Sequence, residues 1–188
     1  GGATTPQPQD WGAIVFNPGS ASTFTHTNVL FGGGNVGANP SFSNINVQGG
    51  NHTFSFGRSA RSGARNFGIS AGTLNITGTE IDNAAFDGVL QLGGTTTITS
   101  ANIHNNVNDG VSAFGGVLDL TSNTFTGNGN RAAFLEADTF FTQTGNTATN
   151  NGLNGFGIDG VMTQNQTWTP GPPYISFSTS TVIVPSGI

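Results

Sequence analysis

Cysteine and lysine are absent from the 188 residues, and the four arginines are the only permanently basic side chains. Without cysteine the chain has no disulfides and no thiol chemistry, so its stability must come from packing. The formal net charge is −5, so the chain offers almost no positively charged surface to which a polyanion could bind. We therefore predict no nucleic-acid partner. No apolar run approaches the roughly 20 residues of a membrane helix, so we expect no membrane insertion.

Strong helix formers are also scarce. Only 7% of the residues are charged, whereas 30 are glycine, and serine, threonine and asparagine are abundant. This composition excludes an ordinary helical domain. The 15 phenylalanines and the regular placement of isoleucine, leucine and valine argue against disorder. An ordered β-rich domain is the remaining class.

A 22-residue repeat runs through the stretch from Gly72 to Asp159. Four segments open at Gly72, Gly94, Gly116 and Asp138, each 22 residues after the previous one. Three largely apolar columns keep this step: Leu74, Thr96, Leu118 and Phe140; Ile76, Ile98, Leu120 and Thr142; Ile81, Ile103, Phe125 and Thr147. Self-similarity at this period is typical of a solenoid.

Each repeat holds three short expected strands, such as residues 73–77, 79–82 and 88–92. The predicted fold is all-β: a single-stranded parallel β-helix solenoid with about 22 residues per coil, plus a separate C-terminal strand. Because strand side chains alternate, Leu74 and Ile76 should point inward and Asn75 outward. A turn column of Asn106, Asn128 and Asn150 should stack and hydrogen-bond along the axis.

Three segments are expected along the chain. Residues 1–10 form an extended lead, since Pro6 and Pro8 forbid helix. Residues 11–167 form the β-helix, with strands at 11–16, 22–31, 42–47 and 53–56 before the clear repeats. Residues 168–188 form a Pro-hinged strand that either caps its own last coil or docks on another molecule. The start at glycine favours a processed secreted protein or a piece cut from a longer chain.

Two stretches resemble segments of bacterial cell-surface right-handed parallel β-helix repeat proteins, in the pectate-lyase-like β-helix superfamily. Residues 11–16, with the sequence WGAIVF, are similar to the strand that opens the coils in that family. Residues 168–188, with Tyr174, Ile175 and the run from Val182 to Pro185, are similar to the cap strand that precedes such coils. The resemblance implies a right-handed helix. It implies no particular activity, because enzymes and non-catalytic surface proteins share these motifs.

Catalysis on this fold requires acidic residues that cluster on one face. Asp87 and Asp109 are 22 residues apart and should stack, with Arg131 as the only basic residue expected beside them. Each of these two aspartates precedes a glycine, so a role in starting a turn also explains their positions. His26, His52 and His104 are scattered. We predict no catalytic residue, metal or cofactor, and Asp87 and Asp109 remain the candidates if the protein is an enzyme.

Threonine columns raise the question of an ice-binding face. The 22-residue step aligns Thr73, Thr95, Val117 and Thr139; Thr77, Thr99, Thr121 and Gln143; and, between them, Asn75, Thr97, Asp119 and Phe141. A uniform threonine array is interrupted in all three columns. The β-propensity of threonine alone accounts for much of the pattern.

Three N-glycosylation sequons begin at Asn51, Asn75 and Asn165. Covalent glycans at one or more of them are therefore an expected modification.

The function we expect is that of a secreted structural subunit of an extracellular fibre or cell surface. Solenoid ends expose apolar columns and unpaired backbone that must be capped or joined, so the partner expected is a second copy, head to tail. The candidate contacts are Trp11, Ile14, Phe16, Tyr174, Ile175, Phe177, Val182, Ile183 and Val184. The alternative is a carbohydrate-active or carbohydrate-binding β-helix, a lyase, hydrolase or adhesin with polysaccharide as its partner.

Overall fold

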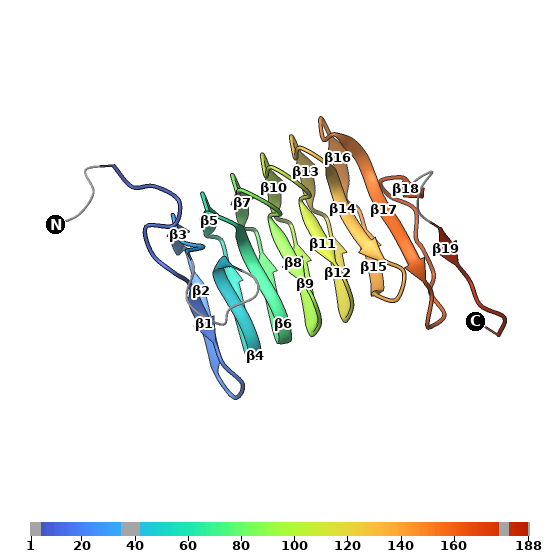
Figure 1. Ribbon diagram of the computed structural model, residues 1–188, viewed down its shortest axis with the longest axis horizontal. Coiled ribbons are helices and arrows are strands. Elements are labelled where there is room, and N and C mark those ends of the chain that lie inside the picture. The colour runs from blue at the N-terminus through green and yellow to red at the C-terminus, as the bar shows by residue number, and fades with distance from the viewer. Residues whose placement is uncertain (1–4, 35–41, 177–180, 188) are drawn as a thin grey trace.

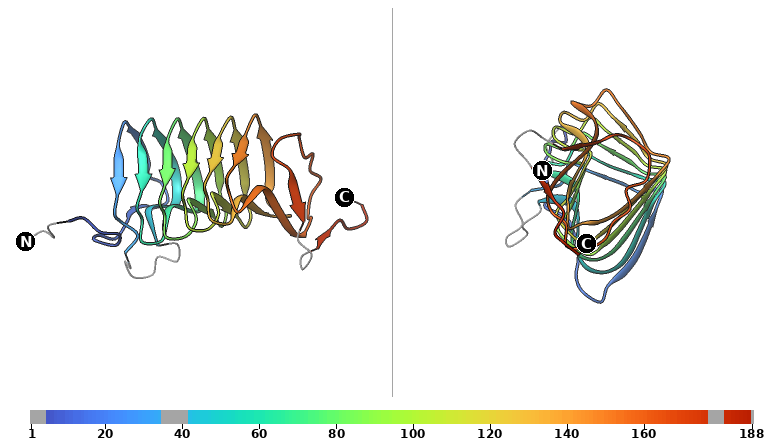
Figure 2. Two further views of the ribbon diagram at one scale, coloured as in Figure 1. Left: turned by 90° about the horizontal axis from the view of Figure 1, so that it is seen from above. Right: turned by 90° about the vertical axis from the view of Figure 1, so that its right-hand side faces the viewer.

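The computed structural model describes residues 5–34, 42–176 and 181–187, and within these ranges the chain is an all-β parallel solenoid without helices. Successive coils follow one another along the long axis, and the two ends of the chain lie at opposite ends of the rod (Figure 1). Seen along the axis, the coils stack into a roughly triangular outline (Figure 2). The described residues contain no helix of the length and apolarity that a membrane crossing requires.

Three rows of strands form the sides of the solenoid. One row contains β2 (Ala21–Thr25), the second half of β4 (Ser43–Ser55) and of β6 (Arg65–Thr77), β9 (Thr95–Thr99), β12 (Val117–Thr121) and β15 (Phe140–Thr144). The second row contains β1 (Ile14–Phe16), the first half of β4 and β6, β8 (Val89–Gln91), β11 (Val111–Ala113), β14 (Arg131–Glu136), β17 (Leu153–Val161) and β18 (Tyr174–Ser176). Because β4 and β6 run from one row into the other, both rows belong to one 13-stranded sheet.

The third row is a separate six-stranded sheet of β3 (Asn28–Leu30), β5 (Arg58–Ala60), β7 (Glu80–Asp82), β10 (Asn102–His104), β13 (Thr124–Thr126) and β16 (Thr147–Thr149). Each coil contributes one strand to it, so the solenoid has about six turns. The last strand, β19 (Val182–Ile183), pairs with the end of β17.

Three of the early strand predictions need correction. The segment expected as one strand over 22–31 is divided into β2 and β3, because His26 turns the corner with φ at +53°. The two strands expected at 42–47 and 53–56 are one continuous strand, β4. The first strand begins at Ile14 and not at Trp11.

The fourth coil is one residue longer than the 22-residue step predicts. Leu118 pairs with Phe141, Leu120 with Gln143 and Phe125 with Ala148, so the predicted column members Phe140, Thr142 and Thr147 are each wrong by one position. The reason lies in the corner before β15. Gly72, Gly94 and Gly116 turn this corner with φ near +80°, a conformation that the next residue in the column, Asp138, adopts only under strain. The coil instead uses the longer turn Ala137–Asp138–Thr139.

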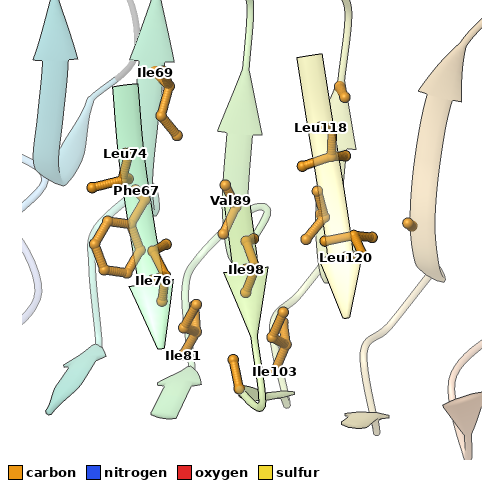
Figure 3. Packing of buried hydrophobic residues seen from close by; sticks show 14 of the residues in the cluster. Phe67, Ile69, Leu74, Ile76, Ile81, Val89, Ile98, Ile103, Leu118 and Leu120 are labelled. Carbon is orange, nitrogen blue, oxygen red and sulfur yellow. The ribbon is translucent and has the colours of Figure 1, made fainter. Parts of the chain in front are cut away.

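The core is a continuous stack of inward side chains (Figure 3). The eight positions predicted to be internal are all at most 1% exposed: Leu74, Ile76, Ile81, Ile98, Ile103, Leu118, Leu120 and Phe125. Thr96 also lies inside, fully buried, and its hydroxyl has no hydrogen-bond partner among the described residues. The alternation that defines the core therefore follows position in the strand and tolerates an occasional polar side chain.

Two asparagine ladders line the inner corners. In the first ladder, Asn106 Nδ2 donates to Asn128 Oδ1 and Asn128 Nδ2 donates to Asn151 Oδ1, each at 2.9 Å. The predicted third member, Asn150, is wrong by the same one-residue insertion. A second ladder joins Asn123 to Asn146 at 3.0 Å. These buried amides also bind main-chain groups of adjacent coils, so they satisfy corner backbone that the sheets leave unpaired.

The C-terminal segment caps the last coil of its own chain. β18 pairs in parallel with β17, and the Tyr174 ring packs edge-on against Phe156 and Phe141. Upstream of β18, the Gln166 side-chain oxygen accepts a 3.0 Å hydrogen bond from the Phe141 main chain. Trp168 stacks on Tyr174 at 5.4 Å between ring centroids. Within the described residues, these contacts place the segment on its own solenoid as a cap.

Candidate functional site

A buried ladder of two aspartates and two arginines crosses four coils of the solenoid. Asp87 and Asp109 stack as predicted, since the Asp109 main-chain nitrogen donates to Asp87 at 3.4 Å. Arg65 lies 3.2 Å from Asp87 on one side, and Arg131 donates two side-chain hydrogen bonds, at 2.8 and 3.0 Å, to Asp109 on the other. The expectation that Arg131 is the only basic neighbour is therefore wrong. Arg65 precedes Asp87 by 22 residues, so the spacing of the repeat alone could have identified Arg65 as a neighbour of Asp87.

Both carboxylates in this ladder are already bound. The Asp87 and Asp109 side chains are 9% and 5% exposed, and Ser112 adds a further hydrogen bond to Asp109. Burial raises the pKa of the Asp87 carboxyl; Arg65 opposes this effect and Asp109 adds to it. Neither oxygen pair faces open space where a substrate could reach it. The ladder therefore acts as an internal brace, and the geometry gives no support to Asp87 and Asp109 as catalytic acids.

We expect the Asp87→Asn variant to gain stability relative to the parent protein as the pH rises above the ordinary aspartate pKa of about 3.9. A carboxyl whose pKa is raised by folding binds its proton more tightly in the native state, so native stability falls as the pH rises through that range. The neutral asparagine removes this slope. Thermal unfolding from pH 3 to pH 7 measures it, with Asp119→Asn, a half-buried surface change of equal charge, as the control. If the stabilities of Asp87→Asn and of the parent protein changed with pH in parallel, the assignment of a raised pKa to Asp87 would be wrong.

A second polar cluster lies on the outer face of the six-stranded sheet. The ligand atoms of Glu80, Asp82 and His104 lie within 4.8 Å of one another, which is close enough for a metal ion. Arg58, however, binds both oxygens of the buried Asp82 carboxylate, at 2.8 and 2.6 Å. His104 lies 3.0 Å from Glu80. Asp82 thus already has a cationic partner, and the side chains of the cluster bind one another.

The predicted glycosylation sites are accessible. Asn51, Asn75 and Asn165 are all exposed; the first two lie on β4 and β6, and the third lies in the segment before β18. Asn75 points outward as predicted, between the buried Leu74 and Ile76. The structure therefore leaves room for a glycan at each sequon.

The predicted assembly residues divide into internal and exposed groups. Ile14, Tyr174 and Val182 pack on the core, and Phe16 is 9% exposed. The Trp11 indole donates a 2.7 Å hydrogen bond to the Leu30 carbonyl at the end of β3. Ile175 is half-buried on β18, and Phe177 lies outside the described residues. Ile183 and Val184 remain exposed, by 49% and 59%.

Comparison with protein families, with curated proteins and with solved structures finds no match to this chain.

Proposed function

We propose that this chain is a secreted structural subunit whose rods join head to tail into an extracellular fibre or surface layer. The observation that carries the proposal is the open strand edges at both ends of the solenoid. In the described part of the chain, the six-stranded sheet ends in β3, which pairs only with β5, and in β16, which pairs only with β13. Unpaired parallel edges are templates for a further strand, and a second copy offers edges with the same spacing.

The C-terminal end also exposes apolar surface. Val161, Ile183 and Val184 are each about half exposed, and Trp168 is 38% exposed. Val182, Val184 and Trp168, together with Met162 and Gln166, line a shallow pocket of about 380 Å³. Apolar side chains gathered at one end of a rod favour contact with another protein surface. Because Tyr174 and Val182 are used by their own chain, the contact we propose pairs the open strand edges, covers the outer side of this cap and does not require strand exchange.

Charge along the axis favours a head-to-tail order. Arg58, Arg65 and Arg131 pair with Asp82, Asp87 and Asp109 in the middle of the rod, which leaves Asp10 and Arg61 toward the N-terminal end and Glu136, Asp138 and Asp159 toward the C-terminal end. Near the acidic end, Glu136 lies with Asp138 and Asp159, and burial together with these two carboxylates raises its pKa. Near the other end, Arg61 is exposed over the Phe31 ring. Two acidic C-terminal ends therefore repel each other, which favours a head-to-tail contact over a tail-to-tail contact.

The sequence resemblance supports the same setting. Residues 11–16 and 168–188 resemble segments of bacterial cell-surface right-handed β-helix proteins, and the present structure has a parallel solenoid between them. Secretion, self-association and glycosylation at the exposed sequons belong to this proposal. Zero cysteines and a stacked, hydrogen-bonded core are compatible with an extracellular location.

We expect the purified chain to form concentration-dependent oligomers or filaments, because the single chain leaves the apolar surface at its C-terminal end uncovered. Val184→Asp, at the C-terminal end, should abolish them. Val107→Asp is the matched control, because Val107 is 63% exposed on the side of the rod. Sedimentation velocity over a range of concentrations and electron microscopy measure the outcome. A parent protein that stays monomeric throughout, or equal effects of the two variants, would overturn the proposal.

A second candidate function is carbohydrate binding on the side of the rod. Leu92 and Phe114 are 43% and 40% exposed on neighbouring coils, and the Phe114 and Phe134 rings lie 5.4 Å apart. Arg131 stacks over Phe134 at 4.5 Å. Exposed aromatic rings beside hydrogen-bonding groups suit the apolar faces and hydroxyls of a sugar. A glycan-array screen with Phe114→Ala as the comparison tests this candidate separately from assembly.

A further inference from the structure

One side of the solenoid presents a regular array of hydroxyl groups. It consists of the outward residues of β2, β4, β6, β9, β12 and β15, which we call the hydroxyl face. Its first column is hydroxyl-bearing in every coil: Thr25, Ser55, Thr77, Thr99, Thr121 and Thr144. The second column holds Thr23, Thr53, Thr97 and Thr142, with Asn75 and Asp119 in the two remaining coils.

The one-residue insertion in the fourth coil is what makes these columns regular. The 22-residue step places Phe141 and Gln143 on this face and so interrupts both columns. In the structure Phe141 and Gln143 point inward, with 3% and 2% exposure, and Thr142 and Thr144 take their places outside. The array therefore continues to the end of the row. The first column is therefore uninterrupted, and in the second only Asn75 and Asp119 depart from threonine.

Most of these hydroxyls are available to a ligand. Thr23, Thr25, Thr142 and Thr144 are exposed, Thr97, Thr99 and Thr121 are half-buried, and Ser55 is buried. Within the described residues, the hydroxyls of Thr97, Thr99 and Thr142 make no hydrogen bond to protein. Asp119 is the single ionisable side chain in the two columns, and it accepts a 2.8 Å hydrogen bond from Thr121. The face is therefore nearly uncharged and rich in unused donors and acceptors.

Strand propensity alone does not explain this distribution. Threonine favours β-strands wherever they lie, yet β8, β11, β14 and β17 of the neighbouring row contain none. The corresponding column there holds Leu90, Ser112 and Phe134 in successive coils, and the first two are only 6% and 3% exposed. In the six-stranded sheet, threonine occurs only in the last two strands, β13 and β16, so the hydroxyl face is the side of the solenoid that carries threonine in every coil. That selectivity indicates a requirement of the face itself.

The spacing of the face is fixed by the fold. Adjacent strands place equivalent residues about 4.8 Å apart along the axis, and alternate residues lie about 6.6 Å apart along each strand. Each threonine adds a hydroxyl that both donates and accepts hydrogen bonds, together with a methyl group that excludes mobile water. An array with two fixed repeats holds its first layer of water in fixed positions. The surface of an ice crystal is a lattice of water molecules whose repeats have the same scale.

We propose that the hydroxyl face binds the surface of ice. A small dissolved ligand is the less suitable occupant, because such ligands bind in concave sites and this face is one side of a stack of straight strands (Figure 2). A crystalline polysaccharide also presents ordered hydroxyls. The two columns, however, hold no aromatic side chain on which a sugar ring could stack. Exposed Phe140 and Val117 lie in the flanking third column, at its C-terminal end.

The test is partition of the purified chain into slowly growing ice, with thermal hysteresis measured on the same samples. The protein should be produced in a host without N-glycosylation, because Asn51 and Asn75 lie on or beside the hydroxyl face. We expect the parent protein to be enriched in the ice and Thr97→Tyr, in the middle of the face, to be excluded from it. Thr124→Tyr, an exposed threonine of β13 on the six-stranded sheet, is the matched control and should remain enriched.

A gain-of-function variant sharpens the test. Asp119→Thr completes the second column through β9, β12 and β15 and removes its one charge, so hysteresis should rise above that of the parent. Exclusion of the parent from ice would overturn the proposal, as would equal behaviour of the two tyrosine variants at unchanged melting temperature. Binding to crystalline cellulose or chitin that is lost in Thr97→Tyr, without enrichment in ice, would assign the face to polysaccharide instead. End-to-end assembly depends on other residues, and Val184→Asp should leave partition into ice intact.

Discussion

Replacing Ile103 by asparagine is expected to destabilise the solenoid by about 2 to 5 kcal/mol. Ile103 is completely buried on β10, between Ile81 of the preceding coil and Phe125 of the next. The substitution removes apolar contacts on both sides and places an amide where no hydrogen-bond partner lies within the column. Its position in the middle of the stack matters, because a solenoid gains stability from contacts between neighbouring coils.

Urea unfolding followed by far-UV circular dichroism measures this loss. Ile103→Val is the control, since it shortens the side chain without adding a polar group and should cost only about 0.5 to 1.5 kcal/mol. If Ile103→Asn melts at the same temperature as the parent protein, the inward assignment of this column is wrong.

Replacing Asn128 by alanine should lower the free energy of unfolding by a similar amount, roughly 2 to 5 kcal/mol, because it removes hydrogen bonds and not apolar contacts. The Asn128 carboxamide joins three coils: its oxygen accepts from the Asn106 main chain and side chain, and its Nδ2 donates to the Ile103 carbonyl and to Asn151. Asn128 is 1% exposed, so water does not readily replace it. The variant leaves several buried donors and acceptors without partners at once.

Asn102→Ala provides the comparison for this prediction. Asn102 is exposed on β10, and its side chain makes no hydrogen bond within the described ranges. The free energy of unfolding of Asn102→Ala should therefore lie within about 0.5 kcal/mol of that of the parent protein. Equal stabilities for the two alanine variants would show that the ladder contributes nothing to folding.

The fold was accessible from the sequence because the repeat is nearly exact. Every coil obeys the same alternation, so three apolar columns and one asparagine column define the inside and the corners without any knowledge of contacts. The predicted register is wrong by one position after Asp138, because Asp138 replaces the glycine that turns this corner in the earlier coils. The sequence repeat shows that the glycine is missing at this corner. It does not show whether the backbone there becomes strained or the turn gains a residue.

The composition of the surfaces was determined by the sequence, and their organisation was decided only by the tertiary structure. The sequence specifies the threonines, the two stacked aspartates and the sequons. Stacking decides that Asp87 and Asp109 are each bound by an arginine of an adjacent coil, that the C-terminal segment caps its own solenoid, and that Thr142 and Thr144 complete the hydroxyl face. The physical reason is that a strand has two faces: a shift of one residue exchanges every inward side chain with an outward one, and only the register between coils fixes that choice.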